Sequence, residues 1–376
     1  MICEIYDSCG GCTYRDKQYE QYCQEKFEKF KKTISQIGFD DVNINKPHFI
    51  PDGCRRRATF AFEYKKKQLV MGFNEQSSHK IIDVKKCPLL TPTLNNILPF
   101  LKQLIEAICS EPYLVKKGKK NISQYITEGD IFVCEASNGL DVVLEYDAPI
   151  ELNHRMIIFE MVSSQNSIIR ISHRKSAFSD AETIMEKSRP YVKIGKYEVY
   201  IPAGTFLQPS QEGQETLSNL ILKYFENIKG NIADLFCGVG TFSYILAQND
   251  KVKITAVDSS KQLLGGFQDS VNKNQITNIK IINKNLFKYP FDESELKEFN
   301  AILFDPPRAG AKAVCEKIAS SQYKPDVLVA VSCNPDTFIN DAKILISGGY
   351  KLNEVTFVDQ FIYSNHSELV AFFTKE

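Results

Sequence analysis

Beyond Pro209, short apolar runs alternate with segments that have the periodicity of amphipathic helices. A helix is expected over 211–228, and strands are expected over 232–236, 253–258, 279–282, 301–305 and 326–332. Strands that alternate with helices pair in parallel, because each helix crosses back over one face of the sheet. The pattern therefore predicts an α/β fold with a doubly wound sheet, which the last apolar segments, 355–358 and 369–374, complete as an edge hairpin.

The region before Pro209 has a different pattern. A hairpin is expected over 59–73, further strands over 131–136, 141–146, 166–172 and 197–201, and helices over 20–37 and 93–109. Such a succession of strands indicates an antiparallel α+β domain, and 376 residues exceed what one ordinary core supports. We predict three parts: a small cysteine-cluster segment over 1–90 that closes onto the next part, a central α+β domain over 50–205, and a Rossmann-like domain over 206–376.

Charge and hydropathy indicate whether the protein binds nucleic acid or a membrane. The formal net charge is zero, which alone argues against a nucleic-acid binder, but basic runs at 55–57, 65–67 and 116–120 make the amino-terminal half more basic. Each run is also compatible with a solvated hairpin tip. Apolar stretches are too short to span a membrane and a secretory signal is missing, so we expect a cytoplasmic protein without a membrane partner. Because cytoplasmic thiols stay reduced, the eleven cysteines point to metal binding or catalysis rather than disulfides.

A glycine turn follows the first strand of the carboxyl-terminal domain. Gly238 and Gly240 allow a tight turn that a ligand can approach closely. Ser243 stands where a dinucleotide-binding motif has its third glycine, which disfavours a pyrophosphate site, whereas Asp258 ends the next strand and can accept hydrogen bonds from a ribose. This combination favours S-adenosylmethionine over NAD. Asp258 is also compatible with the N-cap of the following helix.

Two further strand ends carry reactive groups. Asp305 begins a D-P-P-R motif, and Cys333 lies in S-C-N-P after the next strand. Ligands of open α/β sheets bind at such ends, although a cysteine is more often a buried small hydrophobe. A thiolate can add to C6 of uracil and make C5 nucleophilic, after which a base must remove the C5 proton. Glu368, in a late H-x-E sequence, is suited to that step.

In chain order, D-L-F-C-G-V-G, D-P-P-R, S-C-N-P and a final H-x-E before an apolar strand resemble the motifs of the RNA uracil-C5 methyltransferase family. The resemblance covers most of the chain and implies a Rossmann-like methyltransferase domain that uses S-adenosylmethionine. It implies that Cys333 is the nucleophile and Glu368 the general base. The residues that would bind the cofactor are Gln208, Phe236, Asp258, Asn285 and Asp305. Asp258 departs from the glutamate usual in the family.

Four cysteines form a candidate metal site: Cys3, Cys9, Cys12 and Cys87. Their spacing alone favours structural zinc. The family resemblance instead implies a [4Fe–4S] cluster like that of its ribosomal-RNA members, with proline after the distant fourth cysteine. Since this chain begins at the cluster, without a TRAM domain, it is most similar to the short 23S rRNA subgroup.

These features together predict S-adenosylmethionine-dependent methylation of uracil C5 in 23S rRNA, which gives 5-methyluridine. The phosphates would be held by three consecutive arginines of the central domain, Arg55, Arg56 and Arg57. Arg57 lies in the strand that starts there, so a structural role is the alternative to RNA binding for this residue. Methylation of tRNA, or a non-catalytic metal-stabilised RNA-binding protein, are the competing functions. The sequence indicates no obligate protein partner.

Overall fold

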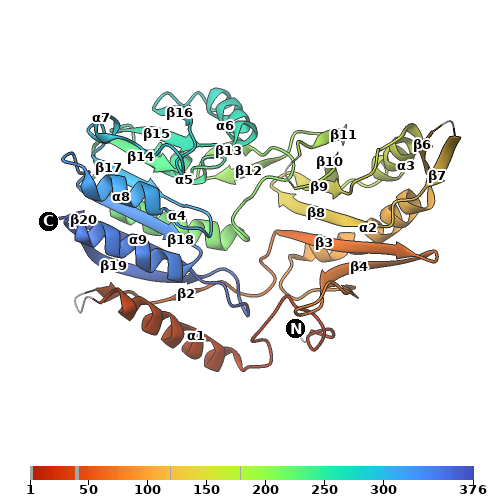
Figure 1. The fold of residues 1–376 in the computed structure, drawn as a ribbon, viewed down its shortest axis with the longest axis horizontal. Coiled ribbons are helices and arrows are strands. Elements are labelled where there is room, and N and C mark those ends of the chain that lie inside the picture. Colours follow the sequence, from red (N-terminus) through yellow and green to blue (C-terminus); the bar gives the residue numbers. More distant parts are fainter. Residues whose placement is uncertain (1–2, 39–41, 119, 178) are drawn as a thin grey trace. The chain divides into compact units, whose positions relative to one another are not determined.

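The chain, seen as a computed structural model in Figure 1, is described over residues 3–38, 42–118, 120–177 and 179–376. It divides into two compact units. Unit 1 comprises Met1–Arg15, Pro51–Val192 and Pro202–Ser210, and unit 2 comprises Asp16–Ile50, Lys193–Ile201 and Gln211–Glu376. Residues 16–38 and 42–50, which the sequence had suggested for the amino-terminal parts, therefore pack in unit 2.

A mixed sheet forms the centre of unit 2, in the order β1-β19-β20-β18-β17-β14-β15-β16, with β2 also paired to β19. The strands are β1 (Asn43–Ile44), β2 (His48–Phe49), β14 (Gly230–Leu235), β15 (Val252–Asp258), β16 (Ile279–Asn283), β17 (Ala301–Phe304), β18 (Val327–Ser332), β19 (Tyr350–Asp359) and β20 (Glu368–Lys375). Strands β14 to β18 are parallel, as predicted, and β20 is antiparallel to both β18 and β19. The β19–β20 hairpin is not the edge, because β1 and β2 pair with β19 beyond it.

Helices cover both faces of this sheet. They are α1 (Tyr19–Ile34) with a 3₁₀ turn (Ser35–Ile37), α4 (Gln211–Phe225), α5 (Thr241–Leu246), α6 (Lys261–Lys273), α7 (Glu293–Leu296), α8 (Lys312–Ser320) and α9 (Pro335–Ser347). One apolar core lies between the sheet and α1, α8 and α9, and a second lies under α4 and α5. The predicted doubly wound arrangement is therefore confirmed.

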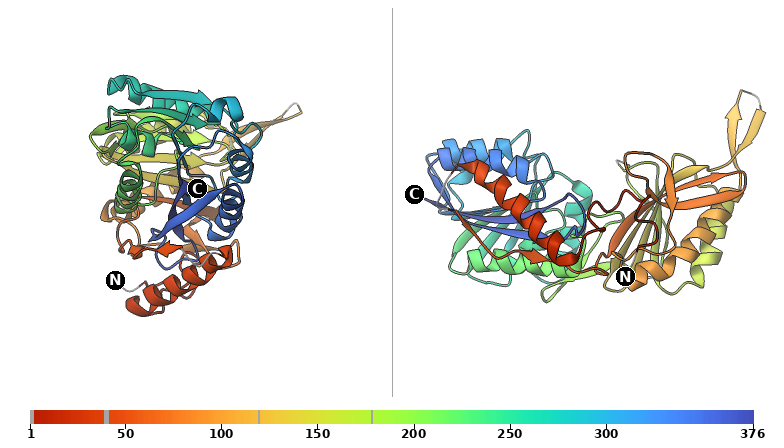
Figure 2. Two further views of the ribbon diagram at one scale, coloured as in Figure 1. Left: turned by 90° about the vertical axis from the view of Figure 1, so that its left-hand side faces the viewer. Right: turned by 90° about the horizontal axis from the view of Figure 1, so that it is seen from below.

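The packing of helix α1 on this sheet is a feature that the sequence did not reveal. It contacts α9 (Figure 2). Its apolar stripe, including Phe30 and Ile34, joins the core on that face of the sheet. Phe30 packs 4.8 Å, centroid to centroid, from the ring of Phe357 on β19. The predicted helix at 20–37 is correct, but its partner is the carboxyl-terminal sheet.

Unit 1 contains a seven-stranded sheet in the order β11-β10-β9-β8-β3-β4-β5. Its strands are β3 (Arg57–Lys65), β4 (Gln68–Asn74), β5 (Ile81–Asp83), β8 (Glu128–Ala136), β9 (Gly139–Glu145), β10 (Ile168–Arg174) and β11 (Glu182–Glu186). All neighbours are antiparallel except β9 and β10, which the helix α3 (Leu152–Ser163) connects. The core lies between the sheet, α3 and α2 (Pro92–Ser110). In the described ranges no helix, α2 included, is long and apolar enough to cross a membrane.

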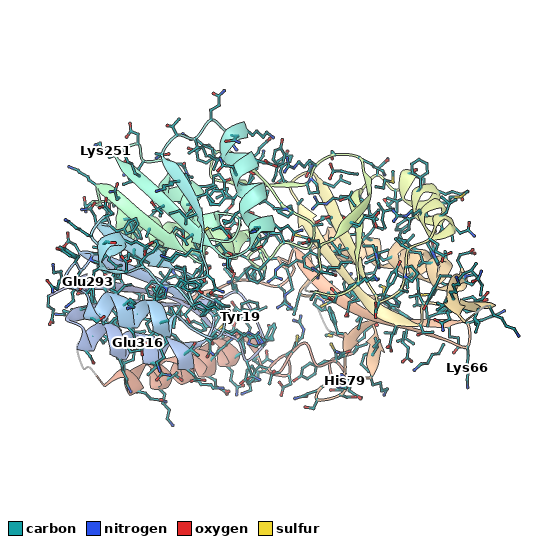
Figure 3. The ribbon with its side chains drawn as sticks, turned by 45° about the horizontal axis from the view of Figure 1, so that its top comes forward. Tyr19, Lys66, His79, Lys251, Glu293 and Glu316 are labelled. Atoms are coloured by element: carbon teal, nitrogen blue, oxygen red, sulfur yellow. The ribbon has the colours of Figure 1, made fainter. Side chains whose placement is uncertain are left out.

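Two short pairings remain, β6 (Tyr113–Lys117) with β7 (Lys120–Gln124), and β12 (Tyr191–Ile194) with β13 (Tyr197–Tyr200). Two of the basic runs are hairpin tips, as the alternative interpretation had it. Lys66 and Lys67 form the β3–β4 turn with positive φ angles of 51° and 60°, and the side chain of Lys66 points outward (Figure 3). In the run at 116–120, Lys117 pairs with Lys120 at the end of the β6–β7 hairpin, and residue 119 lies outside the described residues.

Candidate active site and cysteine pocket

The turn between β14 and α5 is tightly constrained. Phe236, Gly238 and Gly240 all have positive φ angles, of 61°, 57° and 87°. A Cβ atom at Gly240 would lie 2.3 Å from the ring of Phe267, so only glycine fits there. A bulky residue such as Phe236 rarely adopts this backbone conformation, and such strain is concentrated at functional sites. Both glycines singled out in the sequence thus have a structural reason.

Asp258, at the end of β15, holds this turn. Its Oδ2 accepts a hydrogen bond from the Gly238 amide at 3.0 Å, and its Oδ1 accepts one from the Ser260 amide at 2.9 Å. The N-cap of α6 is Ser260, whose hydroxyl oxygen accepts from the Leu263 amide, so the interpretation of Asp258 as the helix cap is wrong. The carboxylate is instead fixed beside the glycine turn.

Ser243, which stands in place of a third glycine, has a role that the motif did not suggest. Its hydroxyl donates to Oδ2 of the fully buried Asp234 at 2.6 Å. The buried Oδ1 of Asp234 has no hydrogen-bond partner in the described part of the chain. Burial raises the pKa of Asp234 to about 7, although the bonds from Ser243 oppose this shift.

Replacing Ser243 with alanine should destabilise unit 2. The change leaves a buried carboxylate without its hydroxyl donor, which costs about 1–3 kcal/mol. Since that bond favours the charged form, its loss raises the pKa of Asp234 further, and the unfolding free energy should fall more at pH 8 than at pH 6. Urea unfolding at both pH values tests this. Ser320→Ala, at an exposed hydroxyl on α8, is the control, and an equal loss at both pH values would contradict the assignment.

After β16, Asn285 shapes a turn. Its Oδ1 accepts from the amides of Phe287 and Lys288 at 3.1 and 3.2 Å. The Phe287 ring is half-exposed and lies 5.3 Å, centroid to centroid, from the ring of Phe236. Phe236 and Asn285 are therefore parts of one neighbourhood, to which the structure adds Phe287, a residue that no sequence signal marked.

Strand register brings the two predicted catalytic residues together. Ser332, the last residue of β18, pairs with Leu369 of the antiparallel β20. Cys333 follows Ser332 and Glu368 precedes Leu369, so the thiol and the carboxylate leave adjacent strand ends. Glu368 is 3% exposed, whereas Cys333 is half-buried. Asp305 follows β17, the other neighbour of β18.

These groups shift one another's pKa values. Burial raises the pKa of Glu368 to about 7, against a hydrogen bond from Gln360 that lowers it. Burial, and then the charge of Glu368, raise the pKa of Asp305 well above its ordinary value. Burial and the charges of Glu368 and Asp305 raise the pKa of the Cys333 thiol to about 11, while Arg308 lowers it. Both carboxyls therefore resist ionisation, and so does the thiol.

A positively charged ligand would offset the repulsion among the acidic side chains at these strand ends. Asp234 and Asp258 repel each other, Asp234 also repels Asp305, and Asp305 repels Glu368. An opposite charge among carboxylates favours their charged forms and the thiolate alike. The orphaned oxygen of Asp234 and this run of acids fit a cation at the strand ends, such as the sulfonium and ammonium groups of S-adenosylmethionine.

The D-P-P-R loop is fixed by the start of α9. The carbonyl of Arg308 accepts from Asn334 Nδ2 at 3.1 Å and from Thr337 Oγ1 at 3.3 Å, and Asp341 accepts from the Ala311 amide at 2.7 Å. The guanidinium of Arg308 lies 2.9 Å from Nε2 of His366, the histidine of the H-x-E motif. The last three motifs of the sequence thus meet in one place.

Gln208 belongs to unit 1, in the loop 202–210. The buried Arg56 holds this loop, because its Nε donates to the Gln208 carbonyl at 3.1 Å and its amide donates to the Pro209 carbonyl at 2.8 Å. Arg57 stacks its guanidinium 4.2 Å from the ring centroid of Phe206, which is 61% exposed. Phe206 is a candidate ligand contact that sequence analysis missed, and only its place over Arg57 reveals it.

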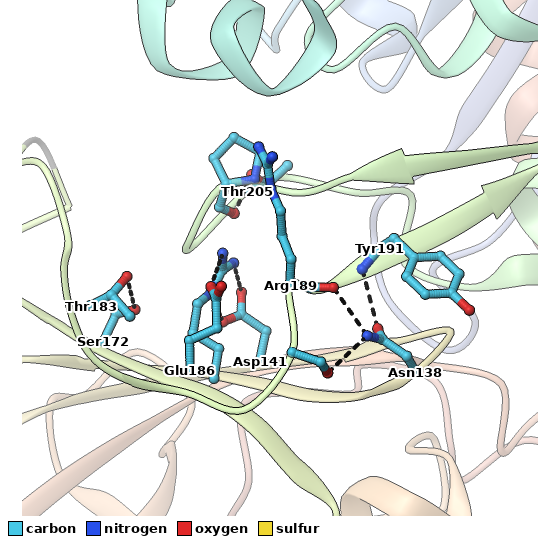
Figure 4. Close-up of polar contacts among 11 residues, drawn as sticks. Asn138, Asp141, Ser172, Thr183, Glu186, Arg189, Tyr191 and Thr205 are labelled. Atoms are coloured by element: carbon cyan, nitrogen blue, oxygen red, sulfur yellow. Dashed lines mark hydrogen bonds and ion pairs between the residues drawn. The ribbon is translucent and has the colours of Figure 1, made fainter. Parts of the chain in front are cut away.

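A buried ion pair supports the same loop. Arg170 donates from Nε and Nη2 to the two oxygens of Asp141, each at 2.8 Å (Figure 4). Its Nη1 lies 3.7 Å from Oε2 of Glu186. Asp141 also accepts from the amide of Gly204, whose φ is 69°. Bidentate charged hydrogen bonds are strong and directional. The loop that carries Phe206 and Gln208 is therefore anchored to β9 and β10.

The four cysteines predicted to bind metal line one cavity of about 90 Å³ in unit 1. The rest of the lining is partly apolar, with Ile5, Phe73, Pro88, Leu89 and Leu90, and partly basic, with Arg15, Arg55 and Lys86. None of the cysteines forms a disulfide. In the described ranges no three candidate ligands are already arranged around one metal position. The sequence prediction that Cys87 joins the amino-terminal cysteines is nevertheless compatible with this shared cavity.

The chemistry of the cavity suits thiolate ligands. The Gly11 amide lies 3.4 Å from Cys9 Sγ, and the amides of Leu89 and Leu90 donate to the Cys87 sulfur. Such N–H donors stabilise sulfur that carries negative charge. Burial, followed by the neighbouring Cys87, raises the pKa of Cys12 to about 12, so neutral thiols are favoured without a cation. These residues therefore fit either an iron–sulfur cluster or zinc.

Comparison with known sequences places these features in a wider group. A protein family described as tRNA (uracil-5-)-methyltransferase matches residues 18–376. A relative named as an uncharacterized RNA methyltransferase of Brucella suis biovar 1 is 33% identical over 99% of this chain and 84% of its own length. The 23S rRNA (uracil(1939)-C(5))-methyltransferase RlmD of Aliivibrio salmonicida is 28% identical over 100% of this chain and 82% of its own.

A solved structure shares the fold. The Pyrococcus abyssi tRNA (uracil-54, C5)-methyltransferase, in complex with S-adenosyl-L-homocysteine, superposes with a TM-score of 0.73 at 24% identity. The match covers 97% of this chain and 86% of that one. The α/β methyltransferase fold predicted from the sequence is thereby confirmed.

Proposed function

Because this chain belongs to the tRNA (uracil-5-)-methyltransferase family, an RNA uracil-C5 methyltransferase family, we propose that it methylates a uracil of 23S rRNA to 5-methyluridine. The observation that carries the chemistry is the β18–β20 register, which sets Cys333 beside Glu368. A nucleophile and a base at neighbouring strand ends suit addition to a pyrimidine followed by proton removal.

Each residue has a distinct role in this proposal. The Cys333 thiolate adds to C6 of the uracil, and the electron pair of the C5–C6 double bond makes C5 nucleophilic. Bound S-adenosylmethionine would supply an electrophilic methyl group: C5 would form a bond to the methyl carbon while the bond of that carbon to sulfur breaks, which leaves S-adenosylhomocysteine. Glu368 then accepts the C5 proton, the C5–C6 double bond re-forms and the C6–S bond breaks, which returns the thiolate.

Five residues are the proposed cofactor contacts. Asp258 and Asn285 border the glycine turn together with Phe236, and Asp305 contributes negative charge at the next strand end. Gln208 is the fifth proposed contact, on the anchored loop of unit 1. For RNA, Arg55 and Arg57 are the proposed contacts, with the exposed Phe206 ring as a surface on which a base can stack. Arg56 is buried against the loop and supports it.

Two observations favour 23S rRNA as the substrate. Relatives named RlmD match the chain from end to end, and the four cysteines share one cavity, as expected for the cluster-bearing ribosomal members. The second candidate is tRNA, which appears both in the description of the family and in the name of the Pyrococcus abyssi enzyme.

A methylation assay separates the two substrates. The full chain is incubated with labelled S-adenosylmethionine and either an unmodified 23S rRNA transcript or tRNA transcripts, and nucleosides are analysed by mass spectrometry. We expect 5-methyluridine in 23S rRNA. Its formation only in tRNA would contradict the substrate, and its absence from both RNAs would contradict the reaction.

For the cysteine cavity, we infer a [4Fe–4S] cluster with Cys3, Cys9, Cys12 and Cys87 as ligands. The shared cavity and the N–H donors to sulfur support it, and the positive charges of Arg15, Arg55 and Lys86 in the lining suit thiolate ligands. The bound metal would tie the amino-terminal segment to the turn at Cys87, which Asn95 holds through bonds to the Cys87 amide and carbonyl. Its removal should therefore destabilise unit 1.

Anaerobic purification tests the cluster. We expect a brown protein with iron and acid-labile sulfide in equal amounts, and a lower unfolding temperature after chelation. Cys12→Ser should lose most of the iron, whereas Cys54→Ser, a half-buried cysteine outside the cavity lining, should keep it. A colourless protein that carries zinc would establish the alternative metal.

A further inference from the structure

We propose that Gln360 is a positioning residue that fixes the carboxylate of Glu368 for proton removal. The Gln360 Nε2 donates a hydrogen bond to Glu368 Oε2 at 2.8 Å. Both side chains are buried, with 4% and 3% exposure. A carboxylate only accepts hydrogen bonds, so the amide nitrogen must face it. The inference rests on the proposed role of Glu368 as the base.

The contact holds one oxygen of the base and leaves the other for chemistry. In the described part of the chain, Gln360 is the one hydrogen-bond donor to the Glu368 carboxylate. With Oε2 held, the orientation of Oε1 is also set, because the carboxylate is planar. Precise orientation of a base governs its efficiency, and a small misplacement costs much rate.

The backbone around Gln360 is itself anchored by α1. The preceding residue, Asp359, is fully buried and accepts from Lys26 Nζ at 2.7 Å and from the Tyr22 hydroxyl. The same hydroxyl oxygen accepts from the Tyr363 amide at 2.7 Å. Two residues of α1 thus hold the chain on both sides of Gln360, which limits the positions that its amide can reach.

The groups around Glu368 make its hydrogen bond from Gln360 important for the ionisation of the carboxyl. The Asp305 carboxyl and the Cys333 thiol lie at the ends of β17 and β18, and the charge of Glu368 raises the pKa of each, while the charges of Lys26 and Asp359 neutralise each other on the α1 side. Burial raises the pKa of Glu368, and Gln360 opposes that shift by favouring the ionised form. Loss of the amide should therefore make the base both less well oriented and harder to ionise.

Gln360→Met tests this, because methionine keeps the side-chain volume and lacks a donor. We expect kcat to fall about tenfold to hundredfold, the loss typical of a hydrogen bond to a charged group. The acidic limb of the kcat–pH profile should move to higher pH. The covalent adduct with 5-fluorouridine RNA should form at nearly the wild-type rate, since that trap needs no proton removal, and a methylated protein–RNA adduct should accumulate with ordinary RNA.

A second variant keeps the test informative if the first folds poorly. Gln360→Asn retains an amide but is one methylene too short to reach Glu368, and it should show the same separation between turnover and trapping. Gln268→Met, at an exposed glutamine on α6, is the matched control and should change neither.

The outcomes are distinguishable from those of the proposed function. The inference is overturned if both Gln360 variants keep kcat within twofold, or if trapping falls in parallel with kcat, as a purely structural defect would cause. Failure of the proposed function would show elsewhere, as full turnover in Glu368→Gln or as trapping in Cys333→Ala.

Discussion

Cys333→Ala should abolish methylation, with a loss of at least about 10⁴-fold in kcat/KM, the scale seen when a covalent nucleophile is removed. The physical reason is that C5 of uracil becomes nucleophilic only after a thiolate has added to C6. Binding of S-adenosylmethionine and of RNA should change little, because the thiol is a small part of either site. Initial rates of methyl incorporation and cofactor titration measure the two effects separately.

Trapping with 5-fluorouridine RNA gives a direct readout. Fluorine at C5 cannot leave as a proton does, so the covalent adduct persists and shifts the protein in a denaturing gel. Wild type should form it and Cys333→Ala should not. Cys23→Ala, at a half-buried cysteine of unit 2 outside the site, should behave as wild type. Retention of methylation by Cys333→Ala would rule out covalent catalysis through this residue.

Glu368→Gln should lower turnover by about 10²- to 10⁴-fold, the usual contribution of a general base, while the covalent step survives. Methyl transfer precedes proton removal in the proposed sequence, so the variant should accumulate a methylated adduct with ordinary RNA. The quantity to measure is the ratio of denaturation-resistant adduct to released 5-methyluridine. Equal loss of both would place Glu368 outside the proton-removal step.

With Glu368 as the proposed base, its pKa should set the pH dependence of the wild type. Burial raises it to about 7, and only the ionised carboxylate accepts a proton, so kcat should fall as pH drops below about 7. Because the charge of Glu368 also raises the pKa of Cys333, Glu368→Gln should lower that pKa. Iodoacetamide should therefore alkylate Cys333 faster in the variant than in wild type at pH 8. A slower reaction would contradict this electrostatic coupling.

Several features of the site followed from local sequence. Apolar runs that end in Asp258, Asp305 and Cys333 marked the carboxyl ends of parallel strands, because buried strands need continuous apolar residues and polar groups collect where they end. Gly240 was likewise predictable, since only glycine adopts such a turn at low cost. Local backbone preferences and burial act over a few residues, and one sequence contains them.

Other features depended on contacts between distant residues. The insertion of β20 between β18 and β19 brings Glu368 to Cys333, and hydrophobic pattern alone does not specify that pairing. The packing of α1 on the carboxyl-terminal sheet, with its buried Lys26–Asp359 pair, spans more than 300 residues of chain.

The sequence by itself determined the class of fold, the order of the strands along the chain and the identities of the thiol, the carboxylates and the cysteines. Tertiary structure alone decided which of these groups meet and which neighbours orient them: Ser243 under Asp234, Phe206 over Arg57, and Gln360 against Glu368. The physical reason is that side-chain chemistry and backbone preference are local, whereas hydrogen-bond partners and pKa values depend on neighbours that only the folded chain brings together.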